Sequence, residues 1–306
     1  KKRRNSMYVI LGATGNTGAA VADNLLAAGQ KVKVVGRSKE RLARFAARGA
    51  EGVKADVCDS VVLKQAFKGA RAVYAMLPPN ITSPDVRAYQ HEATQAIALA
   101  LEEAGVTHVV TLSSIGADKA HKTGPVVGLH LLEKRFAEIP KLNALHLRAG
   151  YFMENTLPQV GIIKSFGMMA GPVREDLPLD MIATRDIGAA AADALLKLEF
   201  SGHQTRELLG QRDLTYQEAA KIVGKAIGKP NLVYLQLPTE QIMQALQQMG
   251  MSKNMATLLC EMSDALNSGH MCALEARAAK NTTPTSFEEF VQKAFVPAYK
   301  AQAAGA

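Results

Sequence analysis

Three glycines, Gly12, Gly15 and Gly18, follow a short apolar run at every third position, and they constrain the fold of this chain more than any other feature. The run, residues 8–11, is typical of a strand buried on both faces of a parallel sheet. Residues 19–28 are Ala-rich and amphipathic, which is typical of a helix. A strand, a Gly-rich turn and a helix in this order are the context that a dinucleotide-binding fingerprint requires. The flanking pattern therefore favours a dinucleotide-binding turn over an ordinary one.

Each glycine has a physical role in such a turn. Gly12 allows the tight turn, Gly15 lets the backbone approach a pyrophosphate, and Gly18 lets the helix pack close to the strand. The N-terminus of the helix then offers unpaired N–H groups and the positive end of its dipole to the phosphates. We therefore expect a pyrophosphate to bind over residues 12–18.

Composition narrows the class of protein. The 306 residues are 48% hydrophobic and 21% charged, as in a soluble globular protein with an ample core. No apolar run approaches the roughly 18 residues that span a membrane, and no secretory signal is visible. The three cysteines, Cys58, Cys260 and Cys272, are scattered and lack metal-ligand spacing. We predict a reduced, cytoplasmic protein with no metal site and no membrane partner.

The net charge of +8 suggests nucleic-acid binding at first sight, but four of the positive charges lie in residues 1–4. This basic tail, residues 1–6, is a remnant of expression, a disordered arm or a localisation patch; we favour the remnant, with Met7 as the natural start. No later stretch combines a basic stripe with interleaved aromatic residues, and the chain has no Trp. We therefore expect no nucleic-acid partner.

The second expected strand, residues 31–35, ends at a position that discriminates between cofactors. An NAD site usually places an Asp or Glu here, which accepts from the ribose 2′-hydroxyl. This chain has Arg37 instead, with Lys39 and Arg41 close behind. A guanidinium suits a 2′-phosphate by charge and by its fork geometry. The alternative is a solvated basic loop, but the missing acid and the added Arg both predict NADP(H).

Strands alternate with helices as far as residue 148, with strands at 52–57, 72–77, 108–114 and 144–148 and helices at 39–48, 86–104 and 128–139. This alternation predicts an α/β fold, a Rossmann-type doubly wound parallel sheet over residues 7–150. From residue 151 to 306 we expect a smaller, mostly helical lobe interleaved with the sheet, with about 182–210 returning to it. Its expected helices are 187–198, 215–228, 241–249, 254–266 and 287–295, the second of them with a capping box from Thr215 to Glu218.

Strand ends supply further cofactor candidates, because ligands in such sheets lie outside the carboxyl ends of the strands. Asp56 and Val57 close the third strand, and Leu77 and Pro78 close the fourth. The Asp56 carboxylate can accept from the adenine amino group, or it can cap the helix that begins near Ser60. The two roles are compatible.

Several motifs together resemble the NmrA-like family of atypical short-chain dehydrogenases/reductases. They are Gly-Ala-Thr-Gly-Asn-Thr-Gly at 12–18, Leu-Arg-Ala-Gly-Tyr-Phe-Met-Glu-Asn at 147–155, Thr-Leu-Ser-Ser-Ile-Gly-Ala at 111–117 and Ile-Ala-Thr-Arg-Asp-Ile-Gly at 182–188. The likeness covers Met7 to about Phe295. It departs at Ala149, where many relatives carry Pro, which should soften that turn. The resemblance implies a Rossmann fold and NADP(H) held by Gly12, Thr14, Gly15, Asn16, Thr17 and Gly18.

The resemblance leaves activity open, since the family mixes NADPH-dependent reductases with regulators that catalyse nothing. Ordinary short-chain reductases use a Ser and a Tyr-x-x-x-Lys helix. Here His130 fills the Tyr position, four residues before Lys134 and on the same helical face. His130 is a candidate proton donor, Ser113 or Ser114 a candidate for polarising a carbonyl, and Lys134 a candidate ribose contact. The alternative is a packed His130 and a solvated Lys134.

The family contacts the nicotinamide end with the residues after the sixth strand, here Tyr151, Phe152 and Asn155. The alternative is that Phe152 and Met153 fill the core. The other methionines, at 168, 169, 243, 249, 251, 255 and 262, include core filler and an adaptable wall of an apolar pocket.

Two functional hypotheses follow. The first is an NADPH-dependent reductase of quinone-like or other conjugated apolar small molecules. Quinone reduction needs hydride transfer to a conjugated acceptor and can proceed without a dedicated Tyr. The alternative is a non-catalytic NADP(H) redox sensor that acts through a regulatory protein partner, as a monomer or homodimer. A purely structural role would leave the glycine fingerprint unexplained.

Overall fold

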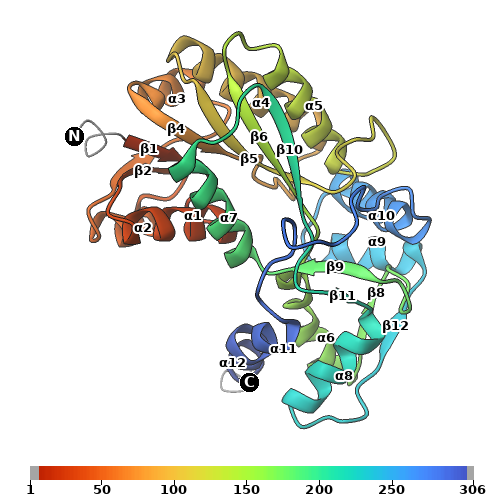
Figure 1. The fold of residues 1–306 in the computed structure, drawn as a ribbon. Helices are drawn as coiled ribbons and strands as arrows, with labels where there is room; N and C mark the ends of the chain where they lie inside the picture. Colours follow the sequence, from red (N-terminus) through yellow and green to blue (C-terminus); the bar gives the residue numbers. More distant parts are fainter. Residues whose placement is uncertain (1–6, 302–306) are drawn as a thin grey trace.

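A seven-stranded parallel sheet forms the centre of the molecule (Figure 1). The computed structural model describes residues 7–301. In order across the sheet the strands are β10 (His203–Leu208), β6 (Asn143–Ala149), β5 (His108–Ser114), β4 (Ala70–Ala75), β1 (Met7–Ile10), β2 (Lys31–Gly36) and β3 (Glu51–Lys54). The chain order reverses between β1 and β4, which is the switch point where ligands bind in such sheets. The predicted doubly wound fold is confirmed.

Alternating side chains of β1 show how the two faces are filled. Tyr8 and Ile10 pack with the helices of one face, and Val9 and Leu11 pack with those of the other. On the first face lie α1 (Asn16–Ala27), α2 (Lys39–Ala46) and α7 (Thr184–Lys197); on the second lie α3 (Ser60–Phe67), α4 (Val86–Glu103) and α5 (Val126–Ala137). Because helices cover both faces of β1, its sequence is a continuous apolar run.

The start of one helix and the cap of another differ from the prediction, although α3 begins at Ser60 as expected. α1 begins at Asn16 rather than at residue 19, so its first turn includes the second half of the glycine motif. The cap of α3 is Asp59, whose Oδ1 accepts from Val62 N at 3.0 Å. Asp56 instead accepts from the N–H of Cys58 at 3.0 Å, so the capping role expected for Asp56 was wrong.

The lobe beyond residue 150 contains helices and two small sheets (Figure 1). Its helices are α6 (Gln159–Phe166), α8 (Tyr216–Ala226), α9 (Thr239–Gln248), α10 (Lys253–Asn267), α11 (Phe287–Phe290) and α12 (Val296–Ala301), with a 3₁₀ turn at Met153–Thr156 and a π turn at Val291–Phe295. The small sheets join β11 (Asp213–Leu214), β9 (Leu179–Ile182) and β7 (Tyr151–Phe152), and β12 (Tyr234–Gln236) with β8 (Met169–Gly171). The capping box of α8 is present as predicted. These strands were not predicted, because two to four residues carry no periodic pattern.

The chain returns from this lobe to the large sheet through α7 and β10. α7 lies along α1, and the approach is so close that a Cβ on Gly188 would lie 2.3 Å from the Cβ of Ala20. β10 then pairs with β6 along its whole length. The division into a domain at 7–150 and a lobe at 151–306 stays a prediction, and the basic tail at 1–6 lies outside the described residues.

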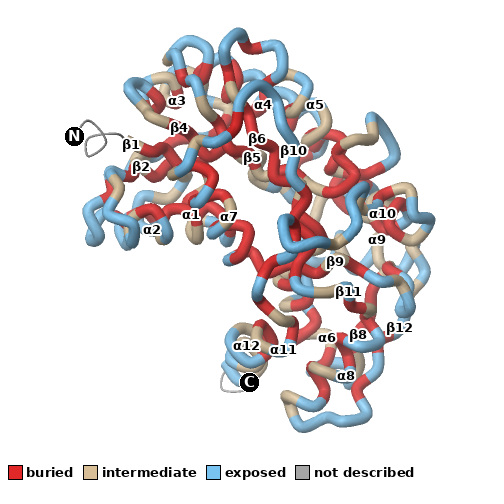
Figure 2. The backbone as a smooth tube through the Cα atoms, viewed as in Figure 1, coloured by how far each residue is buried: buried red, intermediate tan, exposed pale blue. Residues whose placement is uncertain are grey.

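Residues 268–286, here called the strap, connect α10 to α11 without helix or strand. Buried carboxylates hold the strap: Glu207 accepts from Leu274 N at 2.9 Å, and Asp186 accepts from Thr285 N at 2.9 Å. Figure 2 shows the buried strands at the centre and the exposed outer helices. α9 has no buried residue and rests on α10.

Candidate active site

The glycine loop between β1 and α1 is shaped by backbone contacts. Gly12 has a φ of +64°, and a Cβ there would lie 2.6 Å from Met76 Sδ. A Cβ on Gly18 would lie 2.4 Å from the carbonyl oxygen of Gly12, so no side chain fits. A Cβ on Gly15 would meet nothing closer than Gly12 O at 3.4 Å. Gly12 and Gly18 thus hold the loop in shape, and Gly15 leaves its outer surface open.

The N-terminus of α1 has no side-chain cap. Gly15 occupies the cap position, and no side chain accepts from the first turn. Thr14 is half-buried and Asn16 is exposed, whereas Thr17 and Gly18 are buried. Thr14 and Asn16 therefore lie at the surface of the loop, whereas Thr17 and Gly18 lie beneath it.

A cavity of about 220 Å³ lies between this loop and the carboxyl ends of β2 and β3. It brings together seven of the predicted cofactor residues: Gly12, Thr14, Gly15, Arg37, Asp56, Val57 and Pro78. Arg37 is exposed, and within residues 7–301 no carboxylate pairs with it. The cavity therefore offers a free guanidinium where an NAD site would carry an acid.

Arg41 is a residue of this cavity that the sequence analysis mentioned only as a basic neighbour. Its Nη2 donates to the carbonyl oxygen of Thr14 at 2.7 Å, which ties α2 to the glycine loop. The sequence feature that could have identified Arg41 is its position. It lies four residues after Arg37, in the first turn of a helix capped by Ser38. That spacing places Arg41 on the side of α2 that faces the loop.

A second cavity, of about 250 Å³ and here called the apolar cavity, lies at the carboxyl ends of β4, β5 and β6. It includes six of the predicted residues: Leu77, Ser113, Ser114, Tyr151, Phe152 and Asn155. Its other walls are apolar and come from β5, α5, α10 and the strap: Leu112, Ile115, Val126, Leu129, Met262, Leu266 and Met271, with Gly150. The apolar cavity is thus lined mainly by hydrocarbon side chains, with a few hydroxyl and amide groups.

The methionines divide between several roles. Met262 lines the apolar cavity and Met169 is fully buried in the core, whereas Met249 is 68% exposed. Met271 also lines this cavity, and it was not predicted because an isolated Met in the strap carries no pattern.

His130 and Lys134 do not line the apolar cavity. His130 Nδ1 lies 2.8 Å from the carbonyl oxygen of Ala117, and since a carbonyl only accepts, Nδ1 carries the proton. Lys134 is exposed. The expected grouping of both residues with Ser113 and Ser114 is therefore not assembled.

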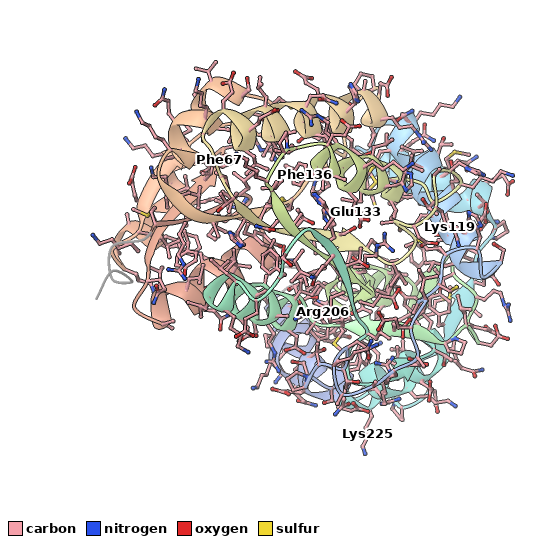
Figure 3. All side chains as sticks on the ribbon, turned by 45° about the horizontal axis from the view of Figure 1, so that its top comes forward. Phe67, Lys119, Glu133, Phe136, Arg206 and Lys225 are labelled. Carbon is pink, nitrogen blue, oxygen red and sulfur yellow. The ribbon has the colours of Figure 1, made fainter. Side chains whose placement is uncertain are left out.

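Glu133, labelled in Figure 3, faces the sheet in their place, and its side chain is only 10% exposed. Its Oε1 accepts from the hydroxyl of Ser113 at 2.6 Å, and its Oε2 from Arg148 Nη2 at 2.6 Å. Burial opposes the charge of Arg148, but the hydrogen bond and charge of Glu133 outweigh it and raise the pKa of the guanidinium. The proton of the Ser113 hydroxyl is thus committed to Glu133, while the Ser114 hydroxyl has no hydrogen-bond partner among the described residues.

Two other groups, His146 and Tyr151, are held neutral. Burial lowers the pKa of His146 to about 4, and its Nδ1 lies 2.7 Å from Thr111 Oγ1. Tyr151 places its hydroxyl 2.9 Å from that of Tyr216, and burial raises the pKa of both phenols. Tyr151 is therefore a neutral hydrogen-bonding group on the cavity wall.

Comparison with known proteins identifies the family. A sequence model of the NmrA-like family matches residues 4–291. The chain belongs to the NmrA-like family. A curated relative is an NAD(P)H azoreductase of Xenophilus azovorans, 28% identical over 84% of this chain and 86% of its own. The resemblance predicted from the motifs is confirmed.

Two solved structures share the fold. One is the NADPH-dependent quinone oxidoreductase QOR2 of Escherichia coli in complex with NADPH, with a TM-score of 0.78, 22% identity, and coverage of 94% of this chain and 98% of that one. The other is NmrA, a negative transcriptional regulator, in complex with NADP, with a TM-score of 0.68, 14% identity and 98% coverage of both chains. The chain is thus similar both to oxidoreductases and to a regulator, which share one fold.

Two kinds of feature are absent from residues 7–301. No helix there is long and apolar enough to cross a membrane. Over the same residues, no group of His, Cys, Asp and Glu side chains could hold a metal ion.

Proposed function

We propose that the glycine loop and the cavity beside it bind NADP(H). Gly15 leaves the outer surface of the loop open, and the first turn of α1, which no side chain caps, suits a pyrophosphate. Arg37 and Arg41 border the cavity where a 2′-phosphate would lie. Structural neighbours solved with NADPH or NADP support the assignment.

We further propose that the protein is an NADPH-dependent reductase of quinone-like or other conjugated apolar small molecules. The observation that carries this proposal is the apolar cavity at the ends of β4, β5 and β6, beside the cofactor loop. Bound NADPH would supply a hydride which, with one proton from solvent, reduces a quinone to a hydroquinone and leaves NADP⁺. The free, scattered cysteines fit a reducing, cytoplasmic setting.

The cavity residues would orient the acceptor by hydrogen bonding. Ser114 has a hydroxyl proton free to donate to an acceptor carbonyl, and Tyr151 and Asn155 offer further polar contacts. Ser113 can only accept, because its proton goes to Glu133. His130 as proton donor stays a prediction, and it requires the imidazolium form, since Nδ1 of the neutral ring already serves Ala117.

The test is a titration of NADPH and NADH, followed by acceptors in the same cuvette. We expect NADPH to bind at least tenfold more tightly than NADH, and Arg37→Glu to abolish that preference by replacing attraction with repulsion of the 2′-phosphate. Reduced-nicotinamide absorbance should then fall on adding quinones. Equal binding of the two cofactors would contradict the NADP(H) assignment, and no oxidation across quinones, azo dyes and enones would contradict the reductase.

The second candidate function is a non-catalytic redox sensor acting on a protein partner. A cleft of about 610 Å³ favours it, since the cleft lies between α1, α7 and α11 and shares Thr14, Gly15 and Arg41 with the cofactor cavity. A partner bound there would touch the cofactor loop. Amide hydrogen exchange around Arg185 and Lys293, which line this cleft, should then differ between the NADP⁺ and NADPH forms; equal exchange would count against the sensor.

A further inference from the structure

A smaller cavity of about 140 Å³, here called the side cavity, adjoins the apolar cavity. Three residues, Leu77, Val126 and Leu129, line both cavities. We propose that the side cavity is a subsite for a short alkyl or alkenyl substituent of the acceptor. This inference rests on the reductase function and specifies the substrate class as a conjugated ring carbonyl that carries such an arm.

The chemistry of the walls favours hydrocarbon. Apolar side chains predominate, with three polar but uncharged ones; the lining is Leu77, Pro78, Pro79, Asn80, Val86, Tyr89, Gln90, Pro125, Val126, Leu129 and Met255. Burial raises the pKa of Tyr89 to about 12, so its hydroxyl stays neutral. Gln90 Nε2 donates to Pro125 O at 2.9 Å, which fixes the amide. A charged substituent would find no counter-charge in this lining.

The side cavity is preformed, because α10 is fastened to the segments that form its other walls. Asn254 Oδ1 accepts from Val86 N at 2.9 Å, and Ser252 N donates to Ile81 O at 2.9 Å. Met255 and Val86 pack together with Leu258 on the same side. A ligand entering this space therefore need not order the walls first.

The volumes set the size of the acceptor. A water molecule takes about 30 Å³ of liquid volume, so the side cavity holds roughly four or five methylene-sized groups. The apolar cavity must take both the nicotinamide and the acceptor ring. An arm longer than about five carbons would extend beyond the side cavity and gain little more.

The experiment measures kcat/KM for a series of 2-n-alkyl-1,4-benzoquinones from methyl to octyl at saturating NADPH. Starting from methyl keeps the electronic effect of the substituent nearly constant. We expect kcat/KM to rise up to about fourfold per added methylene, as burial of a CH₂ predicts, and to level off near five carbons. A flat profile, or one that falls from methyl onward, would overturn the proposal.

Two substitutions at Met255 assign the effect to the side cavity. Met255→Ala enlarges it and should move the plateau to longer chains, whereas Met255→Phe fills it and should remove the preference with little change for the methyl compound. Either variant is informative if the other fails to fold. Met249→Ala, at a residue that is 68% exposed, is the matched control and should keep the wild-type profile. Wild-type profiles in both Met255 variants would overturn the proposal.

A binding measurement separates this inference from the reductase function. The same series, as hydroquinones, is titrated into the protein loaded with NADP⁺. Affinity that rises with chain length in the wild type and not in Met255→Phe supports the subsite even where no quinone oxidises NADPH. Affinity independent of chain length would overturn the subsite, whatever the turnover.

Discussion

At the scale of single residues, Gly18 is the position where one added carbon has the clearest consequence. A Cβ there would lie 2.4 Å from Gly12 O and 2.8 Å from Leu11 O, and backbone atoms have little room to move away. Gly18→Ala should therefore lower the free energy of unfolding by about 2 kcal/mol. By displacing the loop, it should also weaken NADPH binding at least tenfold. Urea unfolding and a fluorescence titration of NADPH measure the two effects.

Gly161→Ala is the matched control for this substitution. Gly161 lies within α6, and a Cβ there would meet nothing within 4 Å. Alanine should raise the free energy of unfolding by about 0.5–1 kcal/mol through helix propensity and leave NADPH binding unchanged. Wild-type stability and affinity in Gly18→Ala would show that the close packing of α1 on β1 is dispensable.

At the scale of elements, a buried ion pair helps to dock α5 on β5 and β6, together with the apolar packing of Leu132 and Phe136. Glu133 and Arg148 have side chains only 10% and 12% exposed, joined at 2.6 Å. Glu133→Gln leaves the buried guanidinium without a counter-charge and should lower the free energy of unfolding by about 3 kcal/mol. Chemical denaturation measures the loss.

The double variant Glu133→Leu/Arg148→Met removes both charges and should cost less than Glu133→Gln alone. At the C-cap of the same helix, Glu138→Gln breaks a surface pair with Arg135 and should change the free energy of unfolding by no more than about 0.5 kcal/mol. A double variant less stable than Glu133→Gln would indicate that packing, not the unpaired charge, sets the loss.

At the scale of the whole molecule, a charge cluster fastens the strap to β9 and β11 and gives a pH dependence. Arg277 of the strap donates to Asp180 at 2.9 Å and also contacts Asp213. Burial, reinforced by the Asp213 carboxylate, raises the pKa of Asp180 to about 7. The folded protein therefore binds this proton more tightly than the unfolded chain, whose Asp pKa is about 3.9. The contribution of Asp180 to stability is greatest below about pH 4 and is lost as the pH rises to about 7.

Asp180→Asn cannot titrate, so its stability relative to wild type should increase from about pH 4 to pH 7, by up to about 1.4 kcal/mol per pH unit, and then stay constant. Thermal or urea unfolding across this range gives the difference. Asp176→Asn is the control: Asp176 is exposed, and a hydrogen bond from Arg174 lowers its pKa, so it stays ionised throughout the window. A difference for Asp180→Asn that does not vary with pH would contradict the raised pKa.

Local patterns predicted the sheet and the glycine loop correctly because the physics that produces them is local. An apolar run such as residues 8–11 must be covered on both faces, and three glycines before a helix leave few backbone arrangements. Arg37 was placed at the end of β2 by the same counting. The sequence did not identify the residue that caps α3. Asp56 and Asp59 both precede this helix, and only Asp59 occupies its N-cap position.

The sequence by itself determined the family, the doubly wound sheet and the residues around the cofactor loop, because these depend on neighbours in the chain. Only the tertiary structure decided the substrate side. Successive residues of a helix point about 100° apart, and the packing of α5 on the sheet decides that Glu133, rather than Lys134, faces Ser113. Met262 and Met271 reach the apolar cavity from more than 100 residues beyond β5, and such long-range contacts arise from packing that no local pattern encodes.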